Sequence, residues 1–285
     1  MTNFFSEKTR SIIRNVIIIV FTYPYSMVGY LLRKKTYANI QSLCLFIGYP
    51  RSGHSLIGAI IDAHPNAVIS QELDFVKLYN WGFSMGQLYF LIEQNAKRIA
   101  SKGRNNSGYS YEIEGLWQGT KKDIRVIGDK KGGLSTKRFI KKNNISQIQN
   151  QIPLKFIHVV RNPFDNIATM IKKDKPYTFK GAFQEYQANA LFIESLIMSE
   201  NHSIYTVFHE DLIQNPHEFL KKMCAYLQIP FFEDFADKTN KIIFATVHKS
   251  SKNYSYTETE IKQIYKLIDE VTFLKNKKYT FEKQL

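Results

Sequence analysis

The chain has 285 residues, 44% of them hydrophobic, which is enough to bury the core of one large α/β domain or two small ones. Its formal net charge of +14 predicts an anionic partner such as a nucleotide, an acidic glycan or an anionic lipid. The basic residues form no long block, which argues against nucleic acid as the partner. The two cysteines, Cys44 and Cys224, lie in apolar segments and suggest neither a disulfide framework nor a zinc site, so a reducing, cytoplasmic location is the simpler interpretation.

Residues 15–32 form a charge-free stretch between two basic flanks, Arg10 and Arg14 on one side and residues 33–35 on the other. This stretch reaches the lower length limit for a membrane-spanning helix, but it contains a proline, a glycine and several hydroxyl groups. Basic residues on both sides indicate no orientation in a membrane. Two interpretations stay open: a peripheral membrane contact through residues 10–35, or a helix that packs on the main domain.

Short apolar runs alternate with amphipathic runs through residues 41–285, which we interpret as one domain that follows a basic, apolar helical segment at 1–40. The runs typical of buried strands lie at 43–48, 67–70, 124–127, 155–160 and 203–208. The runs typical of helices lie at 55–63, 81–102, 135–149, 164–173, 181–199 and 257–270. Strands that alternate with helices predict a three-layer α/β fold with a central parallel sheet of about five strands flanked by helices.

The loop after the first predicted strand has the composition of an anion-binding turn. It runs from Gly48 to Ser55 and matches the phosphate loop G-x-x-x-x-G-K-[ST], with His54 in place of the lysine. Backbone N–H groups at the start of the following helix favour an anion there. A nucleotide kinase or ATPase with a degenerate loop is one interpretation. Because the cation of this loop is Arg51 and the lysine is absent, a donor that needs no metal fits better.

A second basic position follows the fourth predicted strand. Arg161 stands at the end of that strand, Pro163 suits the first turn of the next helix, and Thr169 lies about two turns further on. A pair between Arg161 and Asp165 at the start of that helix is the simpler structural explanation. Since the ends of neighbouring parallel strands meet in one crevice, Arg161 and the Gly48–Ser55 loop together predict a two-point phosphate clamp.

The two motifs together resemble the sulfotransferase superfamily that uses 3′-phosphoadenosine 5′-phosphosulfate (PAPS). The resemblance rests on Tyr49–Ser55 and Val160–Thr169, and it continues through Tyr205–Leu212 and Ala225–Pro230. It implies a P-loop NTPase-like fold and PAPS as the co-substrate, with no metal. In that family the first loop holds the 5′-phosphosulfate, which here implies Arg51, Ser52, Gly53, His54 and Ser55.

The resemblance also implies the other site residues. In the family an arginine and a hydroxyl eight positions later hold the 3′-phosphate, and these match Arg161 and Thr169. A glutamate after a D-A-H-P segment is the general base in related enzymes, and it matches Glu72. A lysine in a turn after a strand reaches the sulfonate, and it matches Lys130. The basic, hydroxyl-rich loop near the C-terminus implies three more cofactor contacts: Lys249, Ser251 and Lys252.

The resulting hypothesis is a sulfotransferase that moves the sulfonate of PAPS in line to an acceptor hydroxyl, with Glu72, Arg51 and Lys130 as catalytic residues. Asp74 and His54 are the alternative bases. Aromatic residues after the second predicted strand are expected to shape the acceptor pocket, and with the basic surface they favour a glycan or glycolipid. A non-catalytic basic module that binds glycans or lipids is the non-enzymatic alternative.

Overall fold

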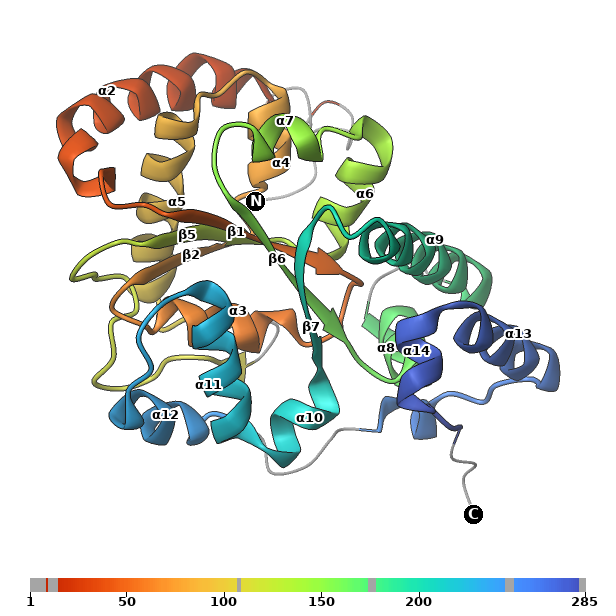
Figure 1. The fold of residues 1–285 in the computed structure, drawn as a ribbon. Coiled ribbons are helices and arrows are strands. Elements are labelled where there is room, and N and C mark those ends of the chain that lie inside the picture. Colours follow the sequence, from red (N-terminus) through yellow and green to blue (C-terminus); the bar gives the residue numbers. More distant parts are fainter. Residues whose placement is uncertain (1–8, 10–14, 107–108, 174–177, 244–248, 282–285) are drawn as a thin grey trace.

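The computed structural model describes residue 9 and residues 15–106, 109–173, 178–243 and 249–281. Its centre is a parallel sheet with the strand order β2-β5-β1-β6-β7 (Figure 1). The strands are β1 Ser42–Gly48, β2 Ala67–Gln71, β5 Val126–Lys130, β6 Leu154–Val160 and β7 Ser203–Phe208. The five predicted strands all occur, and the predicted fold class is confirmed.

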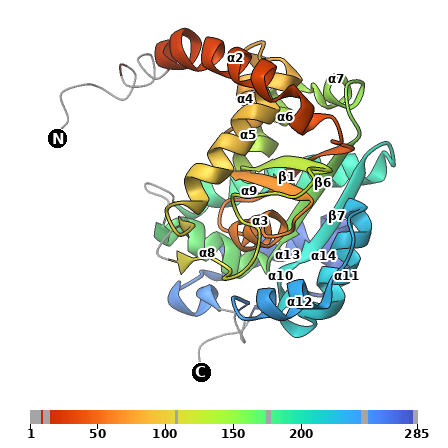
Figure 2. The same ribbon diagram turned by 90° about the vertical axis from the view of Figure 1, so that its left-hand side faces the viewer.

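Helices cover both faces of the sheet (Figures 1 and 2). One layer consists of α4 Phe75–Asn80, α5 Met85–Ala100, α6 Gly133–Lys142, α7 Ile145–Gln149 and α9 Phe179–Met198. The other consists of α3 His54–Asp62, α10 His209–Gln214, α11 Pro216–Leu227 and α12 Glu233–Asn240. The remaining elements are α8 Pro163–Lys173, the 3-10 turn η3 Ser250–Asn253, α13 Glu258–Glu270, α14 Thr272–Lys277 and the hairpin β3 Asn105–Asn106 and β4 Tyr109–Ser110. The sheet therefore lies between two helical layers.

Two predicted boundaries were wrong for local reasons. The third predicted strand starts two residues later, at Val126, and continues to Lys130. Gly128 does not end this strand, because it lets the backbone approach β1: a Cβ atom there would clash with the carbonyl oxygen of Cys44. The helix predicted at 135–149 is broken at Asn143, whose φ of 42° is a left-handed conformation that asparagine tolerates better than most residues.

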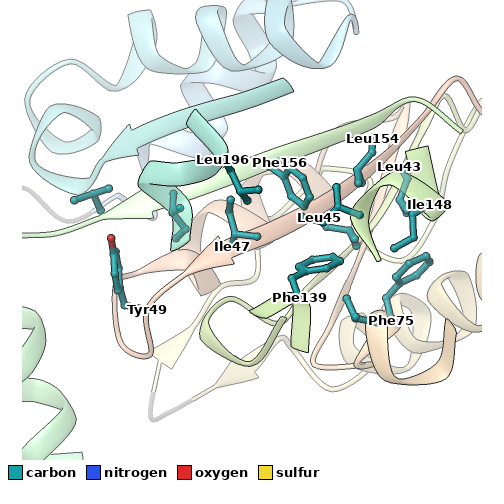
Figure 3. Packing of buried hydrophobic residues seen from close by; sticks show 14 of the residues in the cluster. Leu43, Leu45, Ile47, Tyr49, Phe75, Phe139, Ile148, Leu154, Phe156 and Leu196 are labelled. Carbon is teal, nitrogen blue, oxygen red and sulfur yellow. The ribbon is translucent and has the colours of Figure 1, made fainter. Parts of the chain in front are cut away.

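Every residue of β1 is buried, as in β2, β5 and β6. Leu43, Leu45 and Ile47 point into one layer (Figure 3). In that layer Phe139 of α6 and Phe156 of β6 pack edge to face, with ring centroids 5.7 Å apart. The alternate residues of the strand face the cluster that contains α3. Burial on both faces explains the unbroken apolar run of β1. It also places the loop after β1 on a rigid base.

The N-terminal segment is helical over residues 15–37. It consists of a π-helical stretch η1 Ile18–Thr22, the α-helix α2 Tyr23–Arg33 and a 3-10 turn η2 Lys34–Tyr37, and α2 packs along α5 (Figures 1 and 2). This agrees with a helix packed on the domain. Among the described residues it is also the one helix whose length and mean hydropathy of 1.5 would suit a membrane span, a test that buried core helices and signal sequences pass too.

Candidate functional site

The loop between β1 and α3 has the backbone geometry of a phosphate loop. Three of its residues have positive φ angles: Gly48 at 141°, Arg51 at 66° and Gly53 at 95°. Gly53 caps α3 without a side-chain hydrogen bond to the first turn. The start of a helix carries backbone N–H groups and the positive end of the helix dipole, and both favour an anion.

Side chains from three helices hold this loop in place. The Gly48 N–H donates to Thr136 Oγ1 (2.9 Å), and Asn189 Nδ2 donates to the Gly48 carbonyl (3.0 Å). Asn166 Nδ2 donates to the Pro50 carbonyl (2.8 Å). Thr136, Asn189 and Asn166 come from α6, α9 and α8 and were not predicted as part of the site. No pattern within the loop identifies them, because each is supplied by a distant segment.

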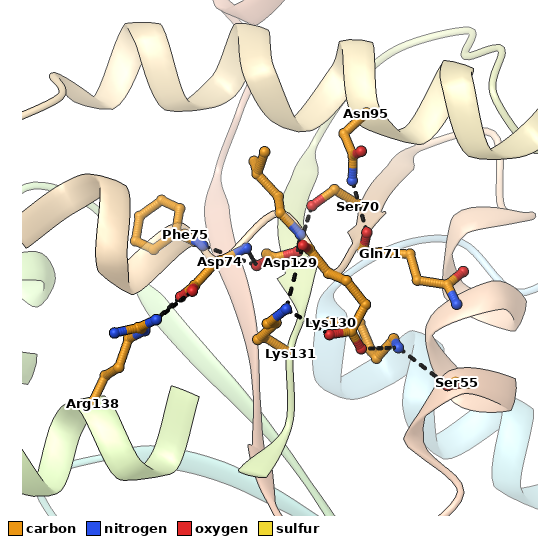
Figure 4. A network of polar contacts seen from close by, with 12 residues as sticks. Ser55, Ser70, Gln71, Asp74, Phe75, Asn95, Asp129, Lys130, Lys131 and Arg138 are labelled. Atoms are coloured by element: carbon orange, nitrogen blue, oxygen red, sulfur yellow. Dashed lines mark hydrogen bonds and ion pairs between the residues drawn. The ribbon is translucent and has the colours of Figure 1, made fainter. Parts of the chain in front are cut away.

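Lys130 brings a cation to the phosphate loop, which lacks a lysine of its own. It ends β5, the strand next to β1, and its ammonium is buried with only 2% of the side chain exposed. Its Nζ lies 3.1 Å from Ser55 Oγ and 2.6 Å from Glu72 Oε1 (Figure 4). Lys131 Nζ lies 2.8 Å from the other carboxylate oxygen, Glu72 Oε2. The structure thus brings Ser55, Glu72 and Lys130 together as the resemblance implies, and it adds Lys131.

The two lysines set the charge state of Glu72. Burial by itself raises the pKa of Glu72, but the charge and hydrogen bond of Lys130, reinforced by Lys131, outweigh it and lower that pKa to about 2. Burial lowers the pKa of Lys130, and the charge of Glu72 opposes that shift. Glu72 is therefore an ionised carboxylate held between two ammonium groups.

A buried carboxylate, Asp129, shapes the turn that carries Glu72. It accepts hydrogen bonds from Ser70 Oγ at 2.6 Å and from the backbone N–H groups of residues 73–75 at 2.9 to 3.1 Å (Figure 4). Glu72 itself has a φ of 62°, a strained angle for a side chain of this kind. We infer that Asp129 stabilises this unusual turn and so aims Glu72 at the phosphate loop.

The second predicted phosphate site is assembled at the end of β6. Arg161 Nη1 donates to Thr169 Oγ1 (3.3 Å), and Arg161 Nη2 donates to Ser250 Oγ (3.1 Å). Thr169 Oγ1 in turn donates to the carbonyl of Asp165 (2.8 Å), whose carboxylate accepts from the Ser251 N–H (2.7 Å). Burial lowers the pKa of Arg161. One guanidinium and two hydroxyl groups therefore gather beside the phosphate loop.

The C-terminal loop reaches this cluster one residue away from the predicted position. Ser251 was predicted as a cofactor contact, but it is buried and anchors the loop through its backbone, whereas Ser250 presents its hydroxyl to Arg161. Lys249 and Lys252 are exposed on either side of this turn. Alternate residues of a tight turn face different ways, and the sequence does not show which serine faces inward. The roles of Lys249 and Lys252 stay predictions.

The two alternative bases contact other side chains. Burial, followed by the charge of Lys130, lowers the pKa of His54 to about 3, so this imidazole is neutral near pH 7. Its Nδ1 lies 2.9 Å from Ser52 Oγ. The carboxylate of Asp74 accepts from Arg138 Nε at 2.6 Å and is directed away from Lys130 (Figure 4). Glu72 remains the acid beside the phosphate loop.

The aromatic residues after β2 do not form one acceptor surface. Tyr109 lies close enough to Arg161 to influence its pKa. Trp117 is at the opposite edge of the sheet, where its backbone N–H donates to the Ala63 carbonyl (3.1 Å) and the residue lines a cavity of about 490 Å³ beside Asn66. Since Asn66 directly precedes β2, that cavity is at the amino ends of the strands. The expectation that these aromatics share a pocket was wrong for Trp117.

Two anion-binding points therefore lie at the carboxyl ends of β1 and β6, which are neighbours in the sheet. This arrangement defines a phosphate-loop protein suited to a nucleotide with phosphate groups at two positions. Residues 44–234 match the model of the sulfotransferase family, and the chain belongs to that family. The predicted class, a PAPS-dependent sulfotransferase, is confirmed by this match. No curated protein matched the sequence.

Solved structures with the same fold include two bacterial sulfotransferases. The sulfotransferase domain of the olefin synthase of Synechococcus PCC 7002 is 16% identical, with a TM-score of 0.53 over 86% of this chain and 97% of that one. Sulfotransferase STF9 from Mycobacterium avium is 9% identical, with a TM-score of 0.52 over 91% of this chain and 83% of that one. In the described ranges, no three His, Cys, Asp or Glu side chains form a group able to hold a metal ion.

Proposed function

We propose that this chain transfers the sulfonate of PAPS to the hydroxyl of a glycan or glycolipid, with Glu72 as the general base. The observation that carries the proposal is the position of Lys130 Nζ between Ser55 Oγ of the phosphate loop and the Glu72 carboxylate. A cation there can contact the transferring group from one side, and a carboxylate can receive the acceptor proton close by.

The two anion sites suit the two ends of the nucleotide. Residues 51–55 would hold the 5′-phosphosulfate, and Arg161 with Thr169 and Ser250 would hold the 3′-phosphate. Arg51 and Lys130 would offset negative charge on the sulfonate and on the bridging oxygen during transfer. The acceptor oxygen attacks the sulfur as its proton passes to Glu72, and adenosine 3′,5′-bisphosphate (PAP) leaves with the electron pair of the broken S–O bond.

Lys130 also links donor binding to the strength of the base. A sulfonate at Ser55 competes with Glu72 for the Lys130 ammonium. When Lys130 turns to the sulfonate, its charge and hydrogen bond lower the pKa of Glu72 less, so the carboxylate becomes a stronger base. We therefore infer that PAPS binds before the acceptor hydroxyl is activated.

The pH dependence of turnover tests the role assigned to Glu72. Lys131→Met removes one of the two ammonium groups that lower the pKa of Glu72, so this pKa rises. The base form exists above this pKa and disappears as the pH falls through it. The acidic limb of kcat/KM is therefore expected to move to higher pH, by roughly one unit. Lys137→Met, which removes the pair between this lysine of α6 and Glu185 of α9, is the matched control and leaves the limb in place. An unchanged limb in Lys131→Met contradicts the base assignment.

Nucleotide binding separates this function from the kinase or ATPase alternative. PAP at ~100 times its Kd is expected to stabilise the chain by about 2.7 kcal/mol in a melting experiment without Mg²⁺. Arg161→Ala removes charge-assisted bonds to a phosphate and is expected to weaken PAP by about 10- to 150-fold, or about 1.5–3 kcal/mol. Arg125→Ala, at the opposite edge of the sheet, is the control. Mg²⁺-dependent stabilisation by ATP, with none by PAP, favours the alternative.

The acceptor class and the cellular location belong to the same proposal. The net charge of +14 favours an acidic or membrane-borne acceptor, and residues 10–35 are proposed to contact a membrane from the cytoplasmic side. Transfer of labelled sulfate is to be screened across sugar, glycolipid and peptide acceptors. Transfer to peptides alone would overturn the acceptor class. Glycan binding with no transfer to any acceptor would favour the non-catalytic module.

A further inference from the structure

The N-terminal helix presents apolar side chains to solvent along most of its length. The most exposed are Phe21 (66%), Leu31 (65%) and Leu32 (82%). The other exposed large apolar residues of this helix are Val16, Ile17, Ile19, Val20, Tyr23, Tyr25, Met27 and Val28. In Figures 1 and 2 the helix forms the outer edge of the molecule, with α5 beneath it. A continuous apolar surface of this kind on a soluble domain indicates an interaction site.

The inner face of the helix is fitted closely to α5. A Cβ atom on Gly29 would lie 2.2 Å from the ring of Phe90, and one on Gly86 would lie 2.5 Å from the ring of Tyr30. Tyr25 packs edge to face on Phe90, with ring centroids 5.1 Å apart. The two helices approach at positions where only glycine fits. This packing indicates that α2 is a permanent part of the domain.

Polar contacts also hold the two helices together. Gln87 Nε2 donates to the Tyr23 carbonyl (3.1 Å) and to Ser26 Oγ (3.2 Å). Arg33 Nη2 and Nε donate to the two oxygens of Glu93 at 2.6 and 3.0 Å. Gln87 and Glu93 are both buried. If α2 left α5 to cross a bilayer, these buried groups would lose partners that no lipid chain replaces.

The charged residues of the helix itself are all basic. No aspartate or glutamate occurs between Glu7 and Asp62 in the sequence. Lys34 and Lys35 are exposed directly after α2. Lysines at the end of an apolar helix are complementary to anionic headgroups, and apolar side chains beside them suit the layer just below.

We propose that this helix lies in the plane of an anionic lipid bilayer, with its outer face in the lipid and its inner face on α5. The proposal rests on the peripheral contact in the proposed function and adds its lipid class and geometry. The start of the helix contacts the segment that follows Glu72, since Lys77 Nζ of α4 donates to Asn15 Oδ1 (3.2 Å) and α4 starts three residues after Glu72. A hydroxyl carried on a lipid headgroup would thus be presented to the active site.

Vesicle sedimentation of the full chain tests the docking surface. Binding is expected to vesicles of phosphatidylcholine with phosphatidylserine, and to be weaker without phosphatidylserine. The double variant Leu31→Glu and Leu32→Glu is expected to bind at least about tenfold more weakly. Met198→Glu, an exposed apolar residue at the end of α9, is the matched control and binds like the wild type. Equal binding by the double variant, or none by the wild type, overturns the proposal.

A disulfide distinguishes an in-plane helix from a spanning one. Ser26→Cys with Gln87→Cys places one thiol on each of two facing helices, where Gln87 Nε2 reaches Ser26 Oγ in the wild type (3.2 Å), and mass spectrometry establishes that the disulfide has formed. The native cysteines are buried. The oxidised protein is expected to bind vesicles as well as the reduced one. Loss of binding on oxidation means that the helix must leave α5, which overturns the proposal.

Alkaline carbonate extraction of the wild-type protein tests the same point without any introduced cysteine. Wild-type protein that resists this extraction from the vesicles overturns the proposal as well. PAP binding measured on the same samples keeps the two proposals separate: vesicle binding without PAP binding contradicts only the enzymatic function.

Discussion

Glu72→Gln is expected to lower kcat by about 10²- to 10⁴-fold, the usual contribution of a general base, while PAP binding stays within a few-fold of the wild type. The amide keeps the size of the side chain but is not able to accept the proton of the acceptor. Glu72 bonds Lys130, whereas Arg161 bonds Thr169, so the amide is expected to leave the proposed 3′-phosphate site unchanged. Labelled sulfate transfer measures the first quantity, and PAP titration measures the second.

Asp74→Asn is the matched control for this substitution. It also replaces a carboxylate by an amide in the same turn, at a residue whose φ of 73° asparagine tolerates. Because Asp74 pairs with Arg138 and does not contact Lys130, it is expected to lower stability more than turnover. If Asp74→Asn loses the activity and Glu72→Gln keeps it, the base is Asp74.

Lys130→Met is expected to lower kcat by about 10²- to 10³-fold, because it removes the buried cation that we propose to contact the transferring group. The methionine keeps most of the stem on which Gly58 of α3 packs. Loss of the ammonium also raises the pKa of Glu72, since Lys130 is the strongest influence that lowers it. The variant should therefore show both a lower plateau of kcat and an acidic limb shifted to higher pH.

The double variant Glu72→Gln with Lys130→Met examines whether the two residues act together. Their side chains are 2.6 Å apart, and residues that act as a unit give effects that do not add. We expect the double variant to lose little more activity than the more damaging single variant. Effects that multiply, or a Lys130→Met enzyme with normal kcat, would show that Lys130 does not serve the same step as Glu72.

Much of the fold follows from local patterns. The five strands, the glycines around the phosphate loop and the arginine at the end of β6 are each readable in a short stretch, because burial on both faces demands apolar runs and tight loops demand glycine. The exceptions were also local. Gly128 looked like a strand end but serves a close approach to Cys44, and Asn143 interrupts a helix whose periodicity continues past it.

The assembly of the site depended on segments far apart in the chain. Ser250 was not among the predicted cofactor contacts, yet it lies against Arg161, whereas Ser251 is buried. The way in which the loop docks on α8 sets which serine faces Arg161. Lys131 forms an ion pair with Glu72, although a second lysine in a basic turn gives no sign of such a partner. Trp117 lies at the far edge of the sheet because its loop returns to the amino end of β2. The spacing of residues along the chain predicts none of these contacts.

The sequence by itself determined that this chain is an α/β sulfotransferase with a phosphate loop at Gly48–Ser55, since strand, turn and helix start there are properties of neighbouring residues. Only the tertiary structure decided which cation serves that loop. Strand order sets β5 beside β1, and this carries Lys130 to Ser55 and Glu72 from 75 and 58 residues away in the chain. It also laid an apolar helix on α5 with its outer face exposed, because glycines at the crossing leave room for an aromatic ring of the other helix.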